Sequence, residues 1–283
     1  MIDNKNFEFY FDCGSSKIRG SAFKKGNSKE SFYVESNFFT DSSNIDYEIQ
    51  EIISSLEKDT KDYIKDVNLM IDSSKMIPIG ISVSKKLDGS QLKQENIQFL
   101  IQEAKQQILK NYPDQSIIHI IVKNYKIDDI DHTYLQKNIN CNSISLDIFF
   151  ICFPKKITEY YKEIFSKLDI SINQFFCTSY AKSINYKNNF SFEGNILFVD
   201  IGFNKTSILY YNNDEIIFFN ILPIGGNHIT KDISKILKVS LYEAEELKLN
   251  FDKNQKLLDS KKISLDLIRQ IIFARVEEIL ELI

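Results

Sequence analysis

Apolar and polar residues follow one another in blocks that predict a mixed α/β fold. Near the N-terminus, aromatic and apolar runs are separated by short polar turns, which is typical of paired strands. Apolar residues then recur at helical spacing from 45 to 64, which predicts an amphipathic helix. The strands predicted in this part of the chain are 7–13, 18–23, 31–39 and 66–72, with turns at 14–17 and 24–29.

Residues 75–153 have a different rhythm and predict a compact α+β unit of their own. An apolar stretch is followed by a turn signal at Asp88-Gly89 and by a long amphipathic segment. Two more apolar stretches then complete the region. The predicted elements are strands at 76–83, 116–122 and 145–153 and a helix at 91–110.

The last part of the chain predicts one helix, a hairpin and three further helices. Pro154 suits the first turn of a helix, and Ser240 with Glu243 three residues later is a capping-box signature. Residues 186–194 are expected to be a polar loop. The final helix stops on Leu282-Ile283 with no polar cap or Gly, so we expect the chain to be a fragment. The predicted helices are 154–168, 228–239, 240–249 and 264–283, and the hairpin is 195–220.

Composition and charge exclude several classes of protein. The chain has 283 residues, of which 43% are hydrophobic and 26% charged, so it can bury a substantial core and is not disordered. Its net charge of −4 argues against nucleic-acid binding. The four Cys and three His show no spacing suited to a metal, and isolated thiols suit a reducing cytoplasm. No run approaches the roughly 18 apolar residues of a spanning helix.

Two hairpins carry the same motif, an Asp-x-Gly at the end of an apolar strand. The first contains Asp12 in "FEFYFDCGSSK", and the second contains Asp200 in "NILFVDIGFNKTS". Turns rich in small residues offer backbone N–H groups and hydroxyls to phosphate oxygens. The aspartates could hold Mg²⁺ through water, and Lys17 could reach a terminal phosphate. Either motif alone is most simply a turn, but two in matching contexts predict a nucleotide triphosphate clamped between two related halves.

Four stretches resemble the actin-like ATPase superfamily, and more narrowly the bacterial cell-division FtsA family. "YFDCGSSKIRGSAF" is similar to the first phosphate motif and "VDIGFNKTSILYY" to the second. "LPIGGNHITKDISKILKVSLYEAEELK" and "ARVEEILEL" resemble the more specific FtsA patterns. The resemblance implies an actin-like (ribonuclease H-like) two-domain α/β fold with a small α+β insertion of the type called 1C. The implied divisions are 1–74 and 154–194 (domain 1A), 75–153 (1C-like insertion), 195–227 (domain 2A) and 228–283 (an incomplete 2B-like lobe).

The resemblance also implies cofactors, partners and a location. ATP and Mg²⁺ would be bound, with Asp12 and Asp200 holding the metal through water. The implied nucleotide-binding residues are Asp12, Gly14, Ser15, Ser16, Lys17, Asp200, Gly202, Asn204, Lys205, Thr206, Gly225 and Gly226. The 2B-like lobe would bind the C-terminal tail of FtsZ with cations at its rim: Lys231, Lys235, Lys238, Arg269 and Arg275.

Self-association into filaments and contacts with other divisome proteins through 75–153 are further implications of the resemblance. The protein would be cytoplasmic and peripheral at the division septum. It would reach the membrane only through a C-terminal helix that, like the adenosine motif, is expected beyond residue 283. No nucleic-acid partner is expected.

Departures from the family pattern limit the expected chemistry. The second phosphate motif normally reads D-I-G-G-G-T-T-D, but here Phe203, Asn204 and Ser207 replace two glycines and the final acid. Asn tolerates the turn geometry, whereas the Phe203 side chain must point away from phosphate. We therefore expect nucleotide binding with at most weak ATPase activity. Two alternatives on the same fold stay open: a type IV pilus assembly ATPase of the PilM kind and a sugar or acetate kinase.

Overall fold

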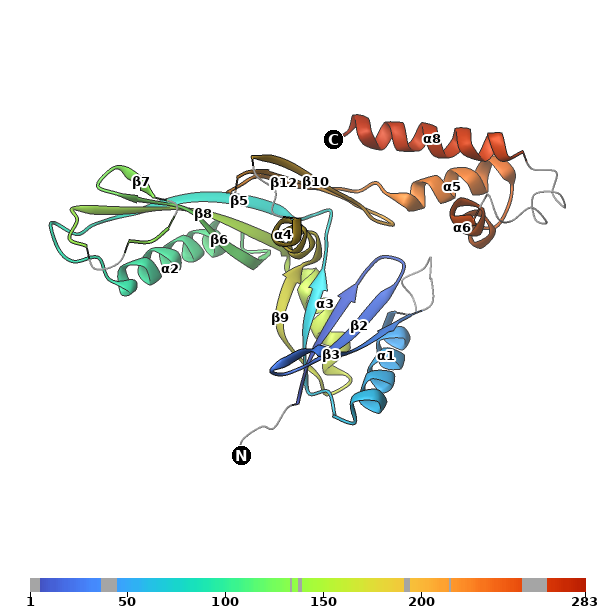
Figure 1. The fold of residues 1–283 in the computed structure, drawn as a ribbon, viewed down its shortest axis with the longest axis horizontal. Coiled ribbons are helices and arrows are strands. Elements are labelled where there is room, and N and C mark those ends of the chain that lie inside the picture. Colours follow the sequence, from blue (N-terminus) through green and yellow to red (C-terminus); the bar gives the residue numbers. More distant parts are fainter. Residues whose placement is uncertain are drawn as a thin grey trace. The chain divides into compact units, whose positions relative to one another are not determined.

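A computed structural model describes residues 6–36, 45–132, 134–136, 139–190, 194–213, 215–250 and 264–283 (Figure 1). The chain divides into two compact units. Unit 1 comprises Met1–Ile64, Phe198–Ile208 and Ile221–Ile283, and unit 2 comprises Lys65–Leu197 and Leu209–Asn220. Each unit is therefore assembled from segments that are distant in the sequence.

Unit 1 begins with an antiparallel sheet in the order β3-β2-β1. Its strands are β1 (Phe7–Cys13), β2 (Ile18–Lys24) and β3 (Asn27–Glu35). Helix α1 (Ile45–Thr60) packs on β2 and β3 through a buried apolar face that includes Ile49 and Leu56. A Cβ on Gly20 would lie 2.3 Å from Ile52 Cγ2, so the absence of a side chain there lets the helix approach the sheet.

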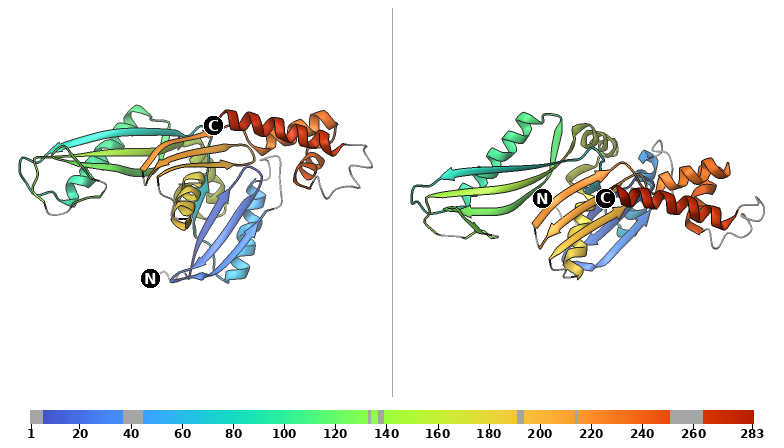
Figure 2. Two further views of the ribbon diagram at one scale, coloured as in Figure 1. Left: turned by 45° about the horizontal axis from the view of Figure 1, so that its top comes forward. Right: turned by 90° about the horizontal axis from the view of Figure 1, so that it is seen from above.

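The rest of unit 1 contains a lobe of three helices, drawn in orange and red in Figure 2. They are α5 (Gly226–Leu237), α6 (Leu241–Asn250) and α8 (Leu265–Glu281). Ile233, Leu247 and Ile268 are buried where the helices meet, together with the other members of one apolar cluster. The predicted capping box is confirmed: the Ser240 N–H donates to Glu243 Oε2 at 2.9 Å, and the Glu243 N–H donates to Ser240 Oγ at 3.2 Å.

Unit 2 contains the parallel pair β4 (Asp66–Ile71) and β9 (Ser171–Cys177), with helices α3 (Lys155–Ser166) and α4 (Thr178–Phe190). Asp72, directly after β4, accepts hydrogen bonds from the Ser179 N–H and hydroxyl, at 3.1 and 2.5 Å. Because these groups lie in the first turn of α4, the carboxylate caps that helix. The polar residues at this strand end thus stabilise the fold of unit 2.

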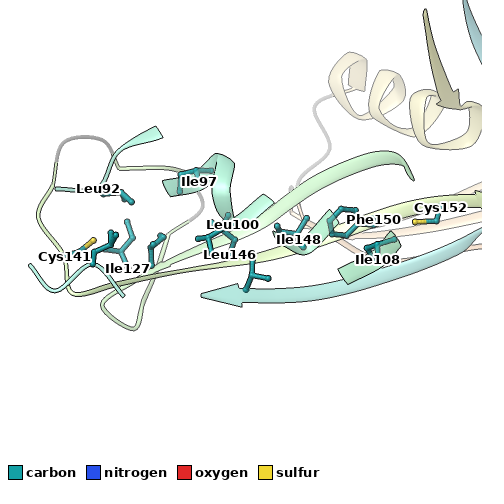
Figure 3. Close-up of a cluster of buried hydrophobic side chains, with 14 residues drawn as sticks. Leu92, Ile97, Leu100, Ile108, Ile127, Cys141, Leu146, Ile148, Phe150 and Cys152 are labelled. Atoms are coloured by element: carbon teal, nitrogen blue, oxygen red, sulfur yellow. The ribbon is translucent and has the colours of Figure 1, made fainter. Parts of the chain in front are cut away.

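A four-stranded sheet in the order β5-β8-β6-β7 forms the other part of unit 2. Its strands are β5 (Ile77–Lys86), β6 (Gln115–Ile127), β7 (Ile130–His132) and β8 (Ser143–Pro154). Helix α2 (Gln94–Asn111) packs on it, and one apolar cluster runs from Cys141 to Cys152 along the sheet (Figure 3). The α2 residues buried in that cluster are Ile97, Leu100, Ala104 and Ile108.

Residues 195–222 form a three-stranded sheet in the order β10-β11-β12. The strands are β10 (Asn195–Ile201), β11 (Thr206–Asn212) and β12 (Glu215–Leu222). Segments of this sheet belong to both units. Within unit 2, Lys123 of β6 forms a 2.8 Å ion pair with Glu215, and the Ser183 and Tyr211 hydroxyls are hydrogen-bonded at 2.6 Å.

Several predicted boundaries are wrong. The turn expected at 24–29 is only Lys25-Gly26, and Gly26 has a φ of +76° there. The first helix ends at Thr60 instead of 64, where Lys61 adopts a positive φ of 56°. The loop expected at 186–194 is helical as far as Phe190, and residues 191–193 lie outside the described part. The domain divisions that the resemblance implies stay a prediction.

Candidate functional site

The first hairpin tip is a tight turn that exposes polar groups. The pairing of Cys13 with Ile18 leaves Gly14, Ser15, Ser16 and Lys17 as the tip. A Cβ on Gly14 would lie 2.7 Å from the Lys17 carbonyl oxygen, so only glycine fits this turn without a shift. All four tip residues are partly exposed, which leaves the hydroxyls and the lysine within reach of a ligand.

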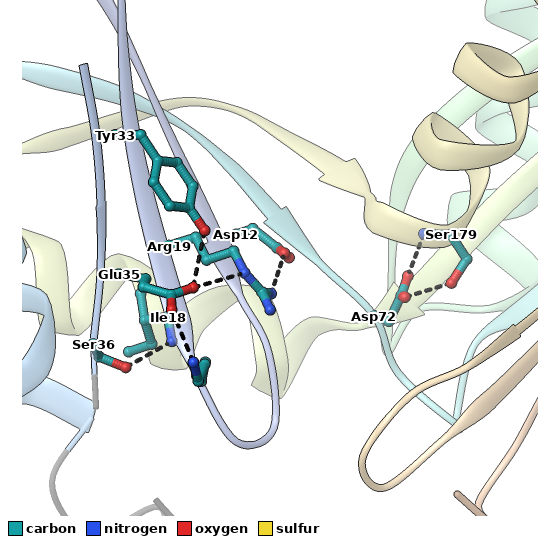
Figure 4. A network of polar contacts seen from close by, with 9 residues as sticks. Asp12, Ile18, Arg19, Tyr33, Glu35, Ser36, Asp72 and Ser179 are labelled. Atoms are coloured by element: carbon teal, nitrogen blue, oxygen red, sulfur yellow. Dashed lines mark hydrogen bonds and ion pairs between the residues drawn. The ribbon is translucent and has the colours of Figure 1, made fainter. Parts of the chain in front are cut away.

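Charged side chains form a ladder across the three strands next to that tip (Figure 4). Asp12, Arg19 and Glu35 are register partners on β1, β2 and β3. The Arg19 guanidinium lies 3.3 Å from the Asp12 carboxylate and 3.6 Å from the Glu35 carboxylate. Lys17 Nζ lies 2.8 Å from Glu35 Oε1, and the Tyr33 hydroxyl donates to Glu35 Oε2 at 3.0 Å. Asp12, predicted to hold the metal, and Lys17, predicted to reach a phosphate, therefore belong to one ion-paired network.

The second hairpin tip is closed by its own hydrogen bonds. The Gly202 N–H donates to the Lys205 carbonyl oxygen at 2.8 Å. Thr206 is fully buried, and its hydroxyl donates to the Ile224 carbonyl oxygen at 2.7 Å. Asp200, near the end of β10, and Lys205 are partly exposed. The Thr206 hydroxyl thus stabilises the hairpin.

The start of α5 is bonded directly to this second tip. The Gly226 N–H donates to the Gly202 carbonyl oxygen at 2.9 Å, and the Asn227 N–H donates to the Phe203 carbonyl oxygen at 2.7 Å. The Asn227 side-chain amide donates to Asn204 Oδ1 at 2.8 Å. A Cβ on Gly225 would lie 2.4 Å from the Gly202 carbonyl oxygen, so glycine is required for this close approach. These bonds use N–H groups that the first turn of a helix commonly offers to an anion.

A buried ion pair of α6 contacts the first residue of α5, and the sequence pattern did not predict it. Lys248 Nζ is 2.6 Å from Glu245 Oε2, 3.2 Å from the Gly226 carbonyl oxygen and 3.0 Å from the Thr230 hydroxyl oxygen. The Thr230 hydroxyl also donates to Glu245. The Phe203 ring centroid lies 5.6 Å from Lys248 Nζ, so the side chain that replaces a family glycine packs against this cation.

The predicted site residues thus gather at two tips, and both tips belong to unit 1. Gly14, Ser15, Ser16 and Lys17 form the first, which fits a phosphate through its hydroxyls, backbone N–H groups and lysine. No group of three His, Cys, Asp or Glu residues suited to a metal occurs in the described part of the chain. The metal site predicted at Asp12 and Asp200 stays a prediction. The placement of Asp12 and Asp200 across a common cleft stays a prediction.

The five predicted partner-binding cations have different surroundings. Lys231, Lys235 and Lys238 are exposed on and just after α5. Arg269 is exposed on α8 and lies 3.5 Å from Asp266. Arg275 is half-buried and forms a 2.7 Å ion pair with Asp232 of α5 and another with Glu278. Arg275 therefore joins two helices of the lobe.

A second cluster of polar side chains, centred on His119, lies in unit 2. The Cys177 N–H donates to His119 Nε2 at 2.9 Å, and the imidazole lies against the rings of Phe176 and Tyr180. Burial lowers the pKa of His119 from 6.5 to about 4, so the imidazole is neutral at pH 7. The Cys177 thiol donates to Asp72 at 3.2 Å, and burial raises the pKa of that thiol. Because Cys177 and Ser179 are inaccessible to solvent, we assign this group a structural role.

The chain has an actin-like α/β fold. Over 95% of its length it is similar to 77% of a solved chain of a PilM-PilN type IV pilus biogenesis complex, with a TM-score of 0.63 and 14% identity. At that identity the similarity is one of fold alone.

In sequence, residues 197–269 match the model of a family described as cell division protein FtsA. The chain is 22% identical over 249 residues to the FtsA of Streptococcus pneumoniae serotype 2 strain D39, covering 82% of this chain and 54% of that protein. It is 26% identical over 168 residues to the FtsA of Neisseria meningitidis serogroup B, covering 59% and 40%. The chain thus spans about half or less of the length of these relatives. No helix in the described residues is long and apolar enough to span a membrane.

Proposed function

We propose that this protein binds ATP with Mg²⁺ at the two hairpin tips of unit 1. The support is chemical: Lys17 and two serines surround the first tip, and Lys205 lies at the second. Asp12 and Asp200 would complete the site, with Gly225 and Gly226 holding the second tip through their contacts with Gly202. When bound, Mg²⁺ would neutralise phosphate charge. Because Ser207 replaces a motif acid and the second tip is bonded to α5, we expect binding with at most weak hydrolysis.

We further propose that the protein acts in cell division by linking FtsZ to the cytoplasmic membrane at the septum. The observation that carries this proposal is the FtsA family match, which spans the second hairpin tip and helices α5 and α6. Self-association, contacts with other division proteins through 75–153 and a peripheral position at the membrane belong to the same proposal. The pilus assembly alternative rests only on a shared fold, and so does the sugar or acetate kinase alternative.

The lobe formed by α5, α6 and α8 offers a surface suited to the FtsZ tail. A groove of about 610 Å³ runs along α8, lined by Arg269, Gln270, Ile272, Phe273 and Val276. Phe273, one of these lining residues, is 69% exposed. A short peptide with acidic and apolar residues would find an apolar groove with a cation at its rim. Lys231 and Lys235 add exposed positive charge on α5.

Fluorescence anisotropy with a labelled FtsZ tail peptide tests this proposal. Reversing Lys231 and Lys235 to Glu should weaken binding about tenfold, or ~1.4 kcal/mol, because both attractive charges become repulsive. The matched control reverses the exposed Lys75 and Lys110, which gives the same net charge away from the lobe. No binding by the unmodified protein, or equal losses in the two double variants, would contradict the FtsZ link.

A further inference from the structure

The charge ladder beside the first tip is balanced without any ligand. It contains two acids, Asp12 and Glu35, and two bases, Lys17 and Arg19, each within ion-pair distance of an opposite charge. A phosphate at this tip therefore meets a lysine that already has a carboxylate partner. The phosphate must compete with that carboxylate for Lys17.

Glu35 is held in the competing position by more than Lys17. It lies at the end of β3, where its register partner Arg19 is directly opposite, and the Tyr33 hydroxyl hydrogen-bonds its second oxygen. The hydrogen bonds from Lys17 and Tyr33 lower the pKa of the Glu35 carboxyl, so it is charged at neutral pH. Glu35 belongs to neither phosphate motif, so the resemblance assigns it no role.

We propose that Glu35 sets the affinity and the phosphate-length preference of the nucleotide site by competing with the outermost phosphate for Lys17. This inference rests on the nucleotide binding proposed above. In the free protein Lys17 pairs with Glu35; in the complex Lys17 exchanges the carboxylate for the terminal phosphate, while Arg19 and Tyr33 retain Glu35. Since Lys17 is expected to reach the terminal phosphate of a triphosphate, a monophosphate, which lacks that phosphate, would not compete with Glu35. Glu35 therefore acts through Lys17 as a positioning residue, and it weakens the binding of a triphosphate more than that of a monophosphate.

The expected effect is modest because the pair is exposed. The side chains of Lys17 and Glu35 are 34% and 40% exposed, and ion pairs of this kind are weak in water. Replacing Glu35 by Gln keeps its shape and one hydrogen-bond acceptor but removes the competing charge. We expect E35Q to bind Mg²⁺·ATP about three- to fivefold more tightly than the unmodified protein, with little change for AMP and an intermediate change for ADP.

The same sheet supplies a matched control. Glu30 also lies on β3 and forms a 2.8 Å ion pair with Lys24 of β2, with both side chains 42% exposed. E30Q therefore changes the net charge by the same amount and removes an equivalent ion pair, but at the end of the strands remote from the tip. We expect E30Q to leave the affinity for all three nucleotides unchanged within about 1.5-fold.

Isothermal titration calorimetry of the whole chain with ATP, ADP and AMP in the presence of Mg²⁺ tests the inference. A gain by E35Q that is largest for ATP and absent in E30Q supports it. An equal gain for all three nucleotides, or an equal gain in E30Q, would show a general charge effect and overturn it. A loss of ATP affinity in E35Q would mean that Glu35 orients Lys17 for the ligand, which also overturns it. If neither the unmodified protein nor E35Q binds ATP, the proposed nucleotide binding fails as well, whereas binding by E35Q alone supports the competition.

Discussion

His119 is a histidine whose neutral form the fold requires. Its Nε2 must be unprotonated to accept the Cys177 N–H, and the ring contacts those of Phe176 and Tyr180. Burial lowers the pKa of the ring to about 4, while the unfolded chain would have a value near 6.5. Between these two values the unfolded state binds more protons than the folded state. The free energy of unfolding therefore falls as the pH is lowered through this window.

This difference predicts an acid-sensitive unit 2. From pH 7 to pH 4, protonation at His119 should cost up to ~3 kcal/mol of stability, since each pKa unit corresponds to ~1.4 kcal/mol. His119→Gln keeps a hydrogen-bond acceptor but cannot titrate, so its stability should depend less on pH. Urea unfolding at pH 7 and pH 4.5 measures the difference, and His132→Gln is the control. Parallel pH profiles for the unmodified protein and His119→Gln would refute the assignment.

At the scale of elements, the seating of α1 on the first sheet depends on Gly20. A Cβ there would lie 2.3 Å from Ile52 Cγ2 and 2.9 Å from Leu56 Cδ1, and both residues are buried in the interface. Gly20→Ala should therefore destabilise the protein by about 1–3 kcal/mol, the usual cost of overpacking. Gly80→Ala in β5 is the matched control, because a Cβ there meets nothing within 4 Å. Equal losses in chemical denaturation would show that strand propensity, and not helix seating, sets the cost.

Elements with a clear apolar period could be predicted from the sequence, and those with polar buried faces could not. Helix α1 follows from its isoleucine and leucine spacing. Helix α4 escaped prediction because its buried residues are Thr178, Ser179 and Ser183, whose hydroxyl-bearing side chains carry no apolar period. Their burial is possible because Asp72 and Tyr211 supply hydrogen-bond partners that come from distant strands.

In the candidate site, too, the features with a local sequence signal could be predicted and the others could not. The hairpin tips were predicted because Asp-x-Gly and Gly-Ser-Ser sequences leave a local signal at Gly14 and Gly202. The ion pair of Lys248 with Glu245 was not, because on a helix an i,i+3 pair of opposite charges is typical of an exposed surface. Its burial depends on the Gly226 carbonyl oxygen and on the Phe203 ring, which only the folded chain brings to it.

At the scale of the whole molecule, the two units should respond differently to nucleotide. Both candidate tips belong to unit 1, whereas the sheet with α2 belongs to unit 2 and has a core of its own. Hydrogen–deuterium exchange with and without Mg²⁺·ATP should therefore show slower exchange, by about tenfold or more at saturation, in peptides covering 12–19 and 200–206. Peptides from 94–111 should be unchanged. Protection confined to 94–111, or none anywhere, would exclude nucleotide binding at the tips.

The bonding of the second hairpin tip to the start of α5 also limits how this protein can diverge. Any side chain at Gly225 would press on the carbonyl oxygens of Gly202 and Phe203. Replacing Asn204 would remove the oxygen that accepts a hydrogen bond from the Asn227 side-chain amide. The other polar atom of that side chain, Asn227 Oδ1, already has no hydrogen-bond partner among the described residues. Residues 202–206 and 225–227 should therefore be inherited as a pair. A chimaera that takes one segment from a distant relative and keeps the other should fold poorly, and exchanging both together should restore it.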